Sequence, residues 1–270
     1  MPTASVNGTE LYYETRGAGE PLLLIQGMSG THASWGEPFL AALEAAGFQT
    51  LRYDHRGIGR STAWREPFTL PELAADAAGL LDAVGWERPH VLGISMGGMI
   101  AQELALAHPE RLRTLSLGCT YAGGPESRMA DPADLQALSE AMMSGDRERA
   151  LRQGYETNVS RAFAADEANY APFHTMATSV PASLPVILLQ MQAIGAHDAS
   201  ARLADLRTPT LVVHGTEDRM LPVSNGSVIA AALPDATLEL LDGIGHMFWW
   251  EQPQRSADLL AAHALGARTP

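Results

Sequence analysis

One serine in this chain has neighbours that could turn a hydroxyl into a nucleophile. Ser95 lies in Gly93-Ile94-Ser95-Met96-Gly97, so a glycine stands two residues before it and another two residues after it. The apolar run 90–94 predicts a strand before Ser95, and the spacing of 96–107 predicts a helix after it. On a sharp strand-to-helix turn the hydroxyl projects beyond the end of the sheet, and glycines remove side chains that would collide there. This context favours a catalytic serine over a simple packing turn.

A serine hydroxyl needs a base that removes its proton, and the chain has nine histidines. His246 differs from the others in its position. It follows the last predicted strand, 236–241, through a loop that contains Gly243 and Gly245. This loop leads off the same edge of the predicted sheet as the turn at Ser95, so we predict His246 to be the general base.

A carboxylate at the end of another strand must fix the tautomer of the imidazole and stabilise its charged form. Asp218 is the candidate, because it follows the predicted strand 208–213 and precedes Pro222, which can open the next helix. Glu217 is the adjacent competitor and would otherwise be a solvated surface acid. No acidic residue directly follows the strand that ends near Leu117. We therefore predict Asp218 to be the acid that orients the base.

The elements that position these residues follow from the hydrophobic pattern. Short apolar runs alternate with longer amphipathic ones, which is typical of a parallel sheet covered by helices on both faces. The alternation stops near Tyr121, and residues 122–206 are rich in alanine and methionine with helical spacing. We interpret 122–206 as a helical cap inserted into a core formed by 1–121 and 207–270. The predicted strands are 9–15, 21–25, 48–53, 90–94, 112–117, 208–213 and 236–241, and the predicted helices are 35–46, 71–84, 96–107, 223–233 and 253–264.

Composition excludes several classes of function. With 31 acidic and 18 basic residues the formal charge is -13, which disfavours nucleic acid and anionic membranes as partners. No apolar run approaches a membrane span and residues 1–17 lack the features of a secretory signal, so we expect a cytoplasmic protein. Cys119 is the only cysteine, which excludes an intramolecular disulfide and a cysteine-based metal cluster. Every basic residue counted is arginine, so lysine-dependent mechanisms are excluded, and we expect neither a metal nor another cofactor.

Five segments outside the predicted cap carry a family resemblance, and these are 21–30, 52–61, 91–105, 214–222 and 243–253. They resemble the α/β-hydrolase superfamily. The resemblance implies the α/β-hydrolase fold, with a mostly parallel eight-stranded sheet, helices on both faces and an inserted helical cap. The chain order Ser95, Asp218, His246 is also typical of this fold. Within the superfamily the chain is similar to the group containing 3-oxoadipate enol-lactonases and aclacinomycin methylesterases, which implies cofactor-free hydrolysis of a carboxylic ester or lactone without fixing the substrate.

An oxyanion hole requires two backbone N–H groups aimed at the developing negative charge. We predict Met96, directly after the nucleophile, and Met28, in the loop after the strand 21–25. Many relatives carry His-Gly where this chain has Gln26-Gly27. With Gln26 the backbone of the loop can still donate to the oxyanion, but the sequence does not show which hydrogen bonds support the loop. Ser29 is either a third, side-chain donor or a cap of the loop.

Other residues are predicted to support the site or to contact the substrate. We interpret Asp54 and Arg56 as parts of an internal network that holds the loops rather than as catalytic groups. Flexible methionines and flat aromatic rings suit an apolar acyl or alcohol group, although each of them alone is as often plain core. The candidate substrate contacts are Met142, Met143, Tyr155, Tyr170, Phe173 and Met191 in the cap and Met247, Phe248 and Trp249 beside the histidine.

These observations lead us to expect a serine hydrolase that cleaves a carboxylic ester or lactone through an acyl-enzyme intermediate. The partner would be this small molecule, and the protein a monomer or homodimer. The same three residues would serve a carbon–carbon bond hydrolase, a cofactor-free perhydrolase or an acyltransferase. A ligand-binding protein without turnover is an alternative from a different class. Epoxide hydrolases and haloalkane dehalogenases are disfavoured, because they need a carboxylate where this chain has Ser95.

Overall fold

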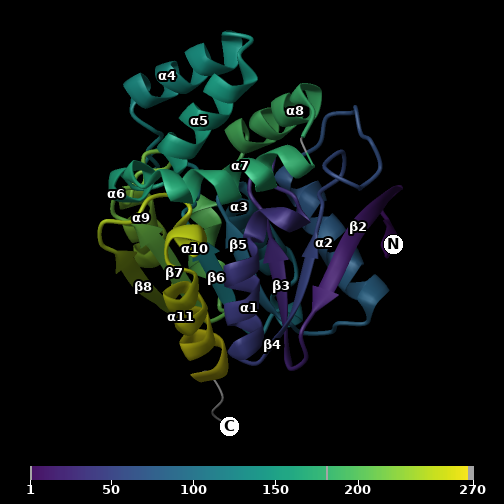
Figure 1. Cartoon of the computed structure of the whole chain (residues 1–270). Helices are drawn as coiled ribbons and strands as arrows, with labels where there is room; N and C mark the ends of the chain where they lie inside the picture. The colour runs from purple at the N-terminus through teal and green to yellow at the C-terminus, as the bar shows by residue number, and fades with distance from the viewer. Residues whose placement is uncertain (1, 181, 267–270) are drawn as a thin grey trace.

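The computed structural model describes residues 2–180 and 182–266, and its centre is one mixed sheet (Figure 1). The strands lie in the order β1-β2-β4-β3-β5-β6-β7-β8. β1 pairs antiparallel with β2, and β2 pairs antiparallel with β4, whereas β3 to β8 all run parallel. This confirms the predicted mostly parallel eight-stranded sheet. The strands are β1 (Thr3–Val6), β2 (Thr9–Arg16), β3 (Glu20–Ile25), β4 (Phe48–Tyr53), β5 (His90–Ile94), β6 (Leu115–Gly118), β7 (Thr210–Gly215) and β8 (Ala236–Leu241).

Helices cover both faces of the sheet and enclose a hydrophobic core on each side. In β3, for example, Leu23 and Ile25 belong to one core, whereas Leu22 and Leu24 belong to the other. Burial on both faces explains why this strand is a continuous apolar run. The first core contains side chains from α2 (Leu70–Val84), α3 (Met96–Ala107) and α9 (Ser224–Ala232), and the second from α1 (Glu37–Ala45), α10 (Phe248–Glu251) and α11 (Pro253–Gly266).

A group of helices lies between β6 and β7 in the sequence. In Figure 1 these helices stand above the ends of the parallel strands. We refer to residues 122–206 as the helical insert. Within the residues that the structure describes, no single helix is long and apolar enough to cross a membrane, and one strongly bent pair passes that test only in combination. The helices of the insert are α4 (Pro132–Met143), α5 (Arg147–Asn158), α6 (Arg161–Ala165), α7 (Tyr170–Ser179) and α8 (Leu184–Gly195).

The structure differs from the sequence-based expectation at short elements and at element starts. The four-residue strand β1 and the four-residue helix α10 were not predicted, because elements so short show no periodicity. The helix expected from Trp35 begins at Glu37, because Gly36 has a φ of 74° and separates a 3₁₀ turn from α1. The strand expected from Leu112 begins at Leu115.

Four neighbouring strands end side by side, and this arrangement prepares the site. The sheet register pairs Ile94 with Gly118, Gly118 with Val213, and Gly215 with Leu241. The loops that follow β5, β6, β7 and β8 therefore meet at one edge of the sheet. In an open parallel sheet this is the edge where ligands bind.

Candidate active site

Ser95 occupies the sharp turn between β5 and α3. Its φ of 53° and ψ of -124° lie in a region that residues other than glycine rarely adopt. A Cβ on Gly93 would lie 2.2 Å from the carbonyl oxygen of Gly97, and a Cβ on Gly97 would lie 2.1 Å from the carbonyl oxygen of Ile25. Only glycine allows α3 to approach β3 and β5 this closely. The turn directs Ser95 to the wall of a cavity beneath the helical insert.

His246 and Asp218 form a buried pair at the same edge. The Nδ1 atom of His246 lies 2.7 Å from the Oδ2 atom of Asp218, and the ring nitrogen donates because a carboxylate can only accept. Burial is the largest single influence on His246 and would lower its pKa, but the charge of Asp218, its hydrogen bond and the contact with Cys119 together raise this pKa well above its usual value. Burial also opposes ionisation of Asp218, yet the charge of His246 and hydrogen bonds from two imidazoles hold the pKa of Asp218 well below its usual range. The pair is therefore a carboxylate beside an unusually basic imidazole.

The remaining contacts of Asp218 fix its orientation. Its Oδ1 atom accepts hydrogen bonds from the backbone N–H of Met220 at 2.9 Å and of Leu221 at 2.8 Å. The Nε2 atom of His214 lies 3.2 Å from Asp218 Oδ2 and 2.8 Å from the carbonyl oxygen of Leu221. His214 directly follows the predicted strand 208–213, and the sequence analysis did not predict this contact. The spacing of four residues around the turn after β7 is the signal that could have indicated it.

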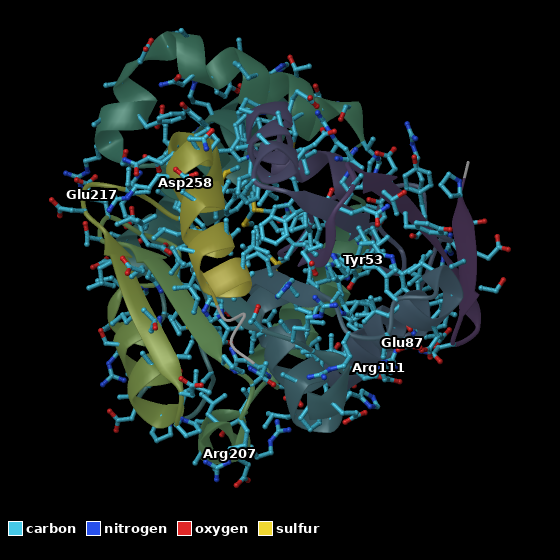
Figure 2. The ribbon with its side chains drawn as sticks, turned by 90° about the horizontal axis from the view of Figure 1, so that it is seen from below. Tyr53, Glu87, Arg111, Arg207, Glu217 and Asp258 are labelled. Carbon is cyan, nitrogen blue, oxygen red and sulfur yellow. The ribbon has the colours of Figure 1, made fainter. Side chains whose placement is uncertain are left out.

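Glu217, the competing acid, points elsewhere. It is exposed at the periphery of the molecule (Figure 2), and its carboxylate accepts a hydrogen bond from the backbone N–H of Arg161 at 3.3 Å. The pairing with His246 therefore belongs to Asp218.

The loop that carries His246 is held on both sides. Gly245 N–H donates to the carboxylate of Glu251 at 2.8 Å, and Met247 N–H donates to the carbonyl oxygen of Asn158 in α5 at 2.8 Å. The same Glu251 carboxylate accepts a hydrogen bond from Ser160. The sequence pattern gave no indication of this glutamate, which ties the loop to both α10 and the insert.

Cys119 is a further neighbour of His246 that was not predicted. It follows β6, is fully buried and has a φ of 40°. Its thiol lies against the imidazole of His246, and burial raises the pKa of the thiol, so it stays protonated at neutral pH. Among the described contacts there is no hydrogen bond between Ser95 Oγ and His246, although both residues line the same cavity.

Two backbone N–H groups beside Ser95 are available to a ligand. Met96 is the first residue of α3, so its N–H is one of the unpaired donors at the positive end of the helix. The loop with Met28 passes directly beside the serine, since a Cβ on Gly27 would lie 3.1 Å from Ser95 Cβ. Within the described part of the chain, neither the Met28 nor the Met96 N–H has a hydrogen-bond acceptor.

The loop that carries Met28 is supported by hydrogen bonds to neighbouring side chains. Gln26 Oε1 accepts a hydrogen bond from Gly27 N–H at 2.8 Å, and His55 Nε2 lies 2.9 Å from the carbonyl oxygen of Gln26. The N–H of Ser29 donates to Gln190 of α8 at 2.9 Å, so one end of the loop is bound to the helical insert. Gln26 therefore supports the loop through its own side chain and its backbone carbonyl.

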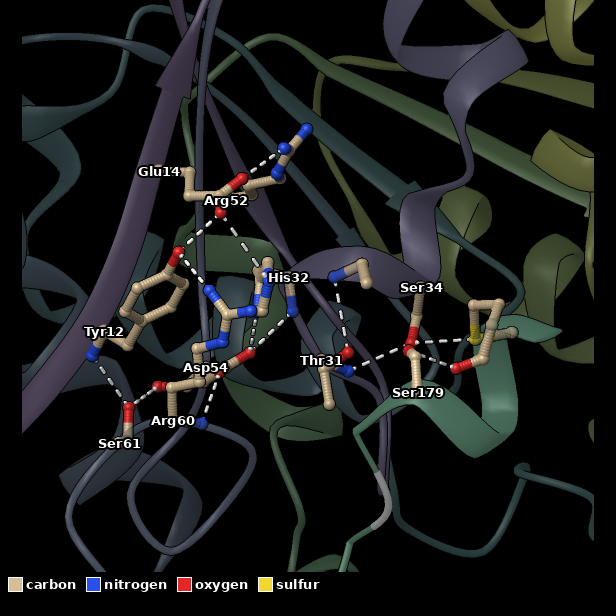
Figure 3. A network of polar contacts seen from close by, with 12 residues as sticks. Tyr12, Glu14, Thr31, His32, Ser34, Arg52, Asp54, Arg60, Ser61 and Ser179 are labelled. Carbon is tan, nitrogen blue, oxygen red and sulfur yellow. Dashed lines mark hydrogen bonds and ion pairs between the residues drawn. The ribbon is translucent and has the colours of Figure 1, made fainter. Parts of the chain in front are cut away.

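A polar network around the buried Asp54 includes His32, which follows this loop in the sequence (Figure 3). Asp54 accepts hydrogen bonds from the backbone N–H of His32 at 2.6 Å and of Arg60 at 2.8 Å, and its Oδ1 lies 2.9 Å from His32 Nδ1. Arg56 does not take part, because it makes two hydrogen bonds to Asp76. Asp54 and Arg56 therefore have separate sets of partners and do not form the single network that the sequence analysis expected.

The cavity has a volume of about 440 Å³ and a mostly apolar wall. Ser95, His246 and Met28 line it, and so do four of the predicted substrate contacts, Met142, Phe173, Met247 and Trp249. Within residues 2–180 and 182–266, no cluster of three or more histidine, cysteine, aspartate or glutamate side chains is arranged to hold a metal ion.

Five predicted contacts lie outside the wall of this cavity. Met143 and Met191 point outward, with 83% and 52% of their surface exposed. Tyr155 packs against the ring of Tyr170 at 5.2 Å, so both rings stabilise the insert. Phe248 packs into the core over β6, where a Cβ on Gly118 would lie 2.7 Å from its ring. Helical periodicity could not show which side of these elements faces the cavity.

Comparisons with known proteins agree with this fold. The model of the α/β-hydrolase fold family matches residues 20–253, and the chain belongs to this family. It is 35% identical over 250 residues to RutD of Azorhizobium caulinodans, a candidate carbamate hydrolase, with 92% of each chain covered. It is 30% identical to the rhodomycin D methylesterase DnrP of Streptomyces peucetius, with 99% of each chain covered. The crystal structure of the enol-lactonase from Burkholderia xenovorans superimposes with a TM-score of 0.83 at 27% identity, covering 98% of this chain and 100% of that one.

Proposed function

We propose that this protein is a serine hydrolase that cleaves a carboxylic ester or lactone through an acyl-enzyme intermediate. The observation that carries the proposal is the buried Asp218–His246 pair at the sheet edge where the strained turn presents Ser95, with both Ser95 and His246 on one cavity wall. The esterase and lactonase names among the relatives support the same chemistry.

In the proposed mechanism, His246 removes the proton of Ser95 as the serine oxygen attacks the substrate carbonyl. The ionised Asp218 keeps the Nδ1 proton of His246 in place and stabilises the imidazolium that forms. The N–H groups of Met28 and Met96 stabilise the oxyanion. His246 then protonates the leaving alcohol, and water activated by the same residue releases the acid.

Residues outside the sheet edge would define the substrate. We propose residues 122–206 as the cap, with 1–121 and 207–270 as the core. Most of the residues around the cavity are apolar, including methionines from α4 and α7, which suits an apolar acyl or alcohol group. A carbamate is a second candidate, favoured by the likeness to RutD, because its carbonyl can accept the same attack.

A substrate panel tests this proposal. p-Nitrophenyl esters, aliphatic lactones and p-nitrophenyl carbamates of graded size would be assayed with wild type and Ser95→Ala, beside a carbon–carbon bond substrate of the dione type. We expect ester or lactone turnover that Ser95→Ala abolishes. Turnover of the dione alone, or binding without turnover of any compound, would contradict the proposal.

A further inference from the structure

The cavity has one positively charged end. Arg147, the first residue of α5, lines it, whereas none of the described residues in its wall is an aspartate or glutamate. The whole chain has 31 acidic residues and a formal charge of -13. A wall with a cation and without carboxylates therefore differs in charge from the molecule around it. Such a wall favours a ligand that carries an anionic group at this end.

Arg147 is exposed and has no partner among the described residues. Its guanidinium makes no hydrogen bond or ion pair with any residue that the structure describes. A cation in the first turn also opposes the helix dipole, so the residue does not stabilise α5. Arg152 on the same helix, by contrast, pairs with Glu167 and lies over the ring of Tyr170. Arg147 is thus a cation left available to a ligand.

The wall between Arg147 and the sheet edge is continuous along α5. Asn158, at the other end of the helix, accepts a hydrogen bond from the N–H of Met247, the neighbour of His246. The eleven residue steps from Asn158 to Arg147 span about 16 Å at the usual helical rise. A Cβ on Gly154, between them, would meet no atom within 4 Å, so the space over the middle of the helix is open. Ala150 and Leu151 complete this face.

We propose that Arg147 binds a carboxylate at the far end of an elongated, apolar acyl group. The substrates would then be esters or lactones of long-chain acids that carry a second, free carboxylate. A planar guanidinium suits this group, because it can donate two parallel hydrogen bonds to one carboxylate. The proposal rests on the proposed function, since Ser95 must attack the other end of the same molecule.

Paired substrates that differ only in the terminal carboxylate test the proposal. The p-nitrophenyl monoesters of succinic, suberic and dodecanedioic acid would be compared with p-nitrophenyl butyrate, octanoate and dodecanoate in wild type and Arg147→Gln. We expect wild type to prefer the carboxylated member of the longest pair. Arg147→Gln should reduce that preference about fivefold, because an exposed ion pair contributes modestly. The loss should lie in KM and not in kcat, since the contact is remote from the reacting carbonyl.

Two further variants separate this subsite from general effects of charge and shape. Arg149→Gln removes the same charge from the same turn of α5, but Arg149 does not line the cavity. It should keep the wild-type preference. Gly154→Leu should narrow the path to Arg147 and reduce turnover of the longest esters while sparing the butyrate. An unchanged preference in Arg147→Gln, or an equal loss in Arg149→Gln, would overturn the proposal.

A binding measurement distinguishes failure of this proposal from failure of the hydrolase function. The monomethyl ester of dodecanedioic acid would be titrated calorimetrically into Ser95→Ala, with and without Arg147→Gln. A fivefold weaker affinity in the double variant would support the carboxylate subsite even if wild type hydrolysed no ester. Equal affinities, or the absence of binding, would overturn the subsite even if wild type hydrolysed many esters.

Discussion

The edge of the sheet and the helical insert face the same cavity but are constructed differently. At the edge, both oxygens of Asp218 accept hydrogen bonds, and the loop of His246 is bound on both sides. In the insert, large apolar side chains of α4 and α8 are exposed. A fixed edge can hold one carbonyl group in a single reactive geometry, whereas flexible side chains can adapt to substrates of different shape. Substitutions at the edge should therefore lower kcat, and substitutions in the insert should change substrate preference.

The largest effects are expected from Ser95 and His246, which exchange a proton in the proposed mechanism. Ser95→Ala removes the atom that forms the acyl-enzyme, and His246→Ala leaves this atom without a base. Each should lower turnover of a p-nitrophenyl ester about 10⁴-fold or more, and the double variant should lose little beyond the worse single one. Steady-state kinetics would measure these losses of turnover, and unchanged midpoints of thermal unfolding would show that the variants are folded. Ser34→Ala, which changes another serine of the cavity wall, is the control. Its turnover should fall less than tenfold, and a tenfold fall corresponds to about 1.4 kcal/mol of activation free energy.

Asp218→Asn should combine a large loss of rate with a shifted pH profile. It should cost on the order of 10³- to 10⁴-fold in kcat through the wrong imidazole tautomer. In wild type the charge of Asp218 raises the pKa of His246, so activity should rise with pH through a value above the ordinary 6.5 of histidine. Without that charge, burial lowers this pKa, and the rising limb should move to lower pH. A profile that stays in place would argue against His246 as the titrating base.

His214 should have an intermediate effect, because it acts through Asp218. His214→Phe removes the Nε2 donor that lies near Asp218 Oδ2 and the Leu221 carbonyl oxygen. We expect kcat to fall about tenfold with KM nearly unchanged, as for a lost positioning hydrogen bond of about 1 to 1.5 kcal/mol. His214→Gln, which retains an N–H donor, should recover part of the loss. A loss confined to thermal stability would assign His214 a structural role only.

The smallest effect is expected in the insert, where two adjacent methionines offer a matched pair. Met142 lines the cavity, whereas Met143 does not and is 83% exposed. Met142→Ala should lower kcat/KM for long acyl esters about threefold, through lost apolar contact, and should leave acetate turnover unchanged. Met143→Ala should change neither. If both variants lost acetate turnover equally, the expectation that the sheet edge determines kcat and the insert determines substrate preference would be wrong.

The sequence was most informative where local chemistry determines the structure. The glycines around Ser95 and the loops before Asp218 and His246 could be located because each lies at or after the end of a predictable strand. The parallel sheet followed from the same alternation of elements. The turn geometry at Ser95 depends on residues within a few positions of it, and local patterns record such constraints well.

The sequence was least informative where distant elements meet. Met142 and Met143 are neighbours in α4, and only the packing of the insert decides which of them faces the cavity. The contact between Gln190 and Ser29 joins residues 161 positions apart, and the contact between Ser160 and Glu251 joins residues 91 positions apart. No periodicity within a single element can predict such pairs. The supports of the site were therefore missed while its central residues were predicted.

Covalent trapping of the nucleophile tests the central claim most directly. A serine-directed fluorophosphonate would be added to wild type and to Ser95→Ala, and the adducts would be measured by intact mass and located by peptide mapping. We expect one adduct per chain in wild type, located on Ser95, and none in folded Ser95→Ala. An adduct on another residue, or equal labelling of both proteins, would contradict the assignment of Ser95 as the nucleophile.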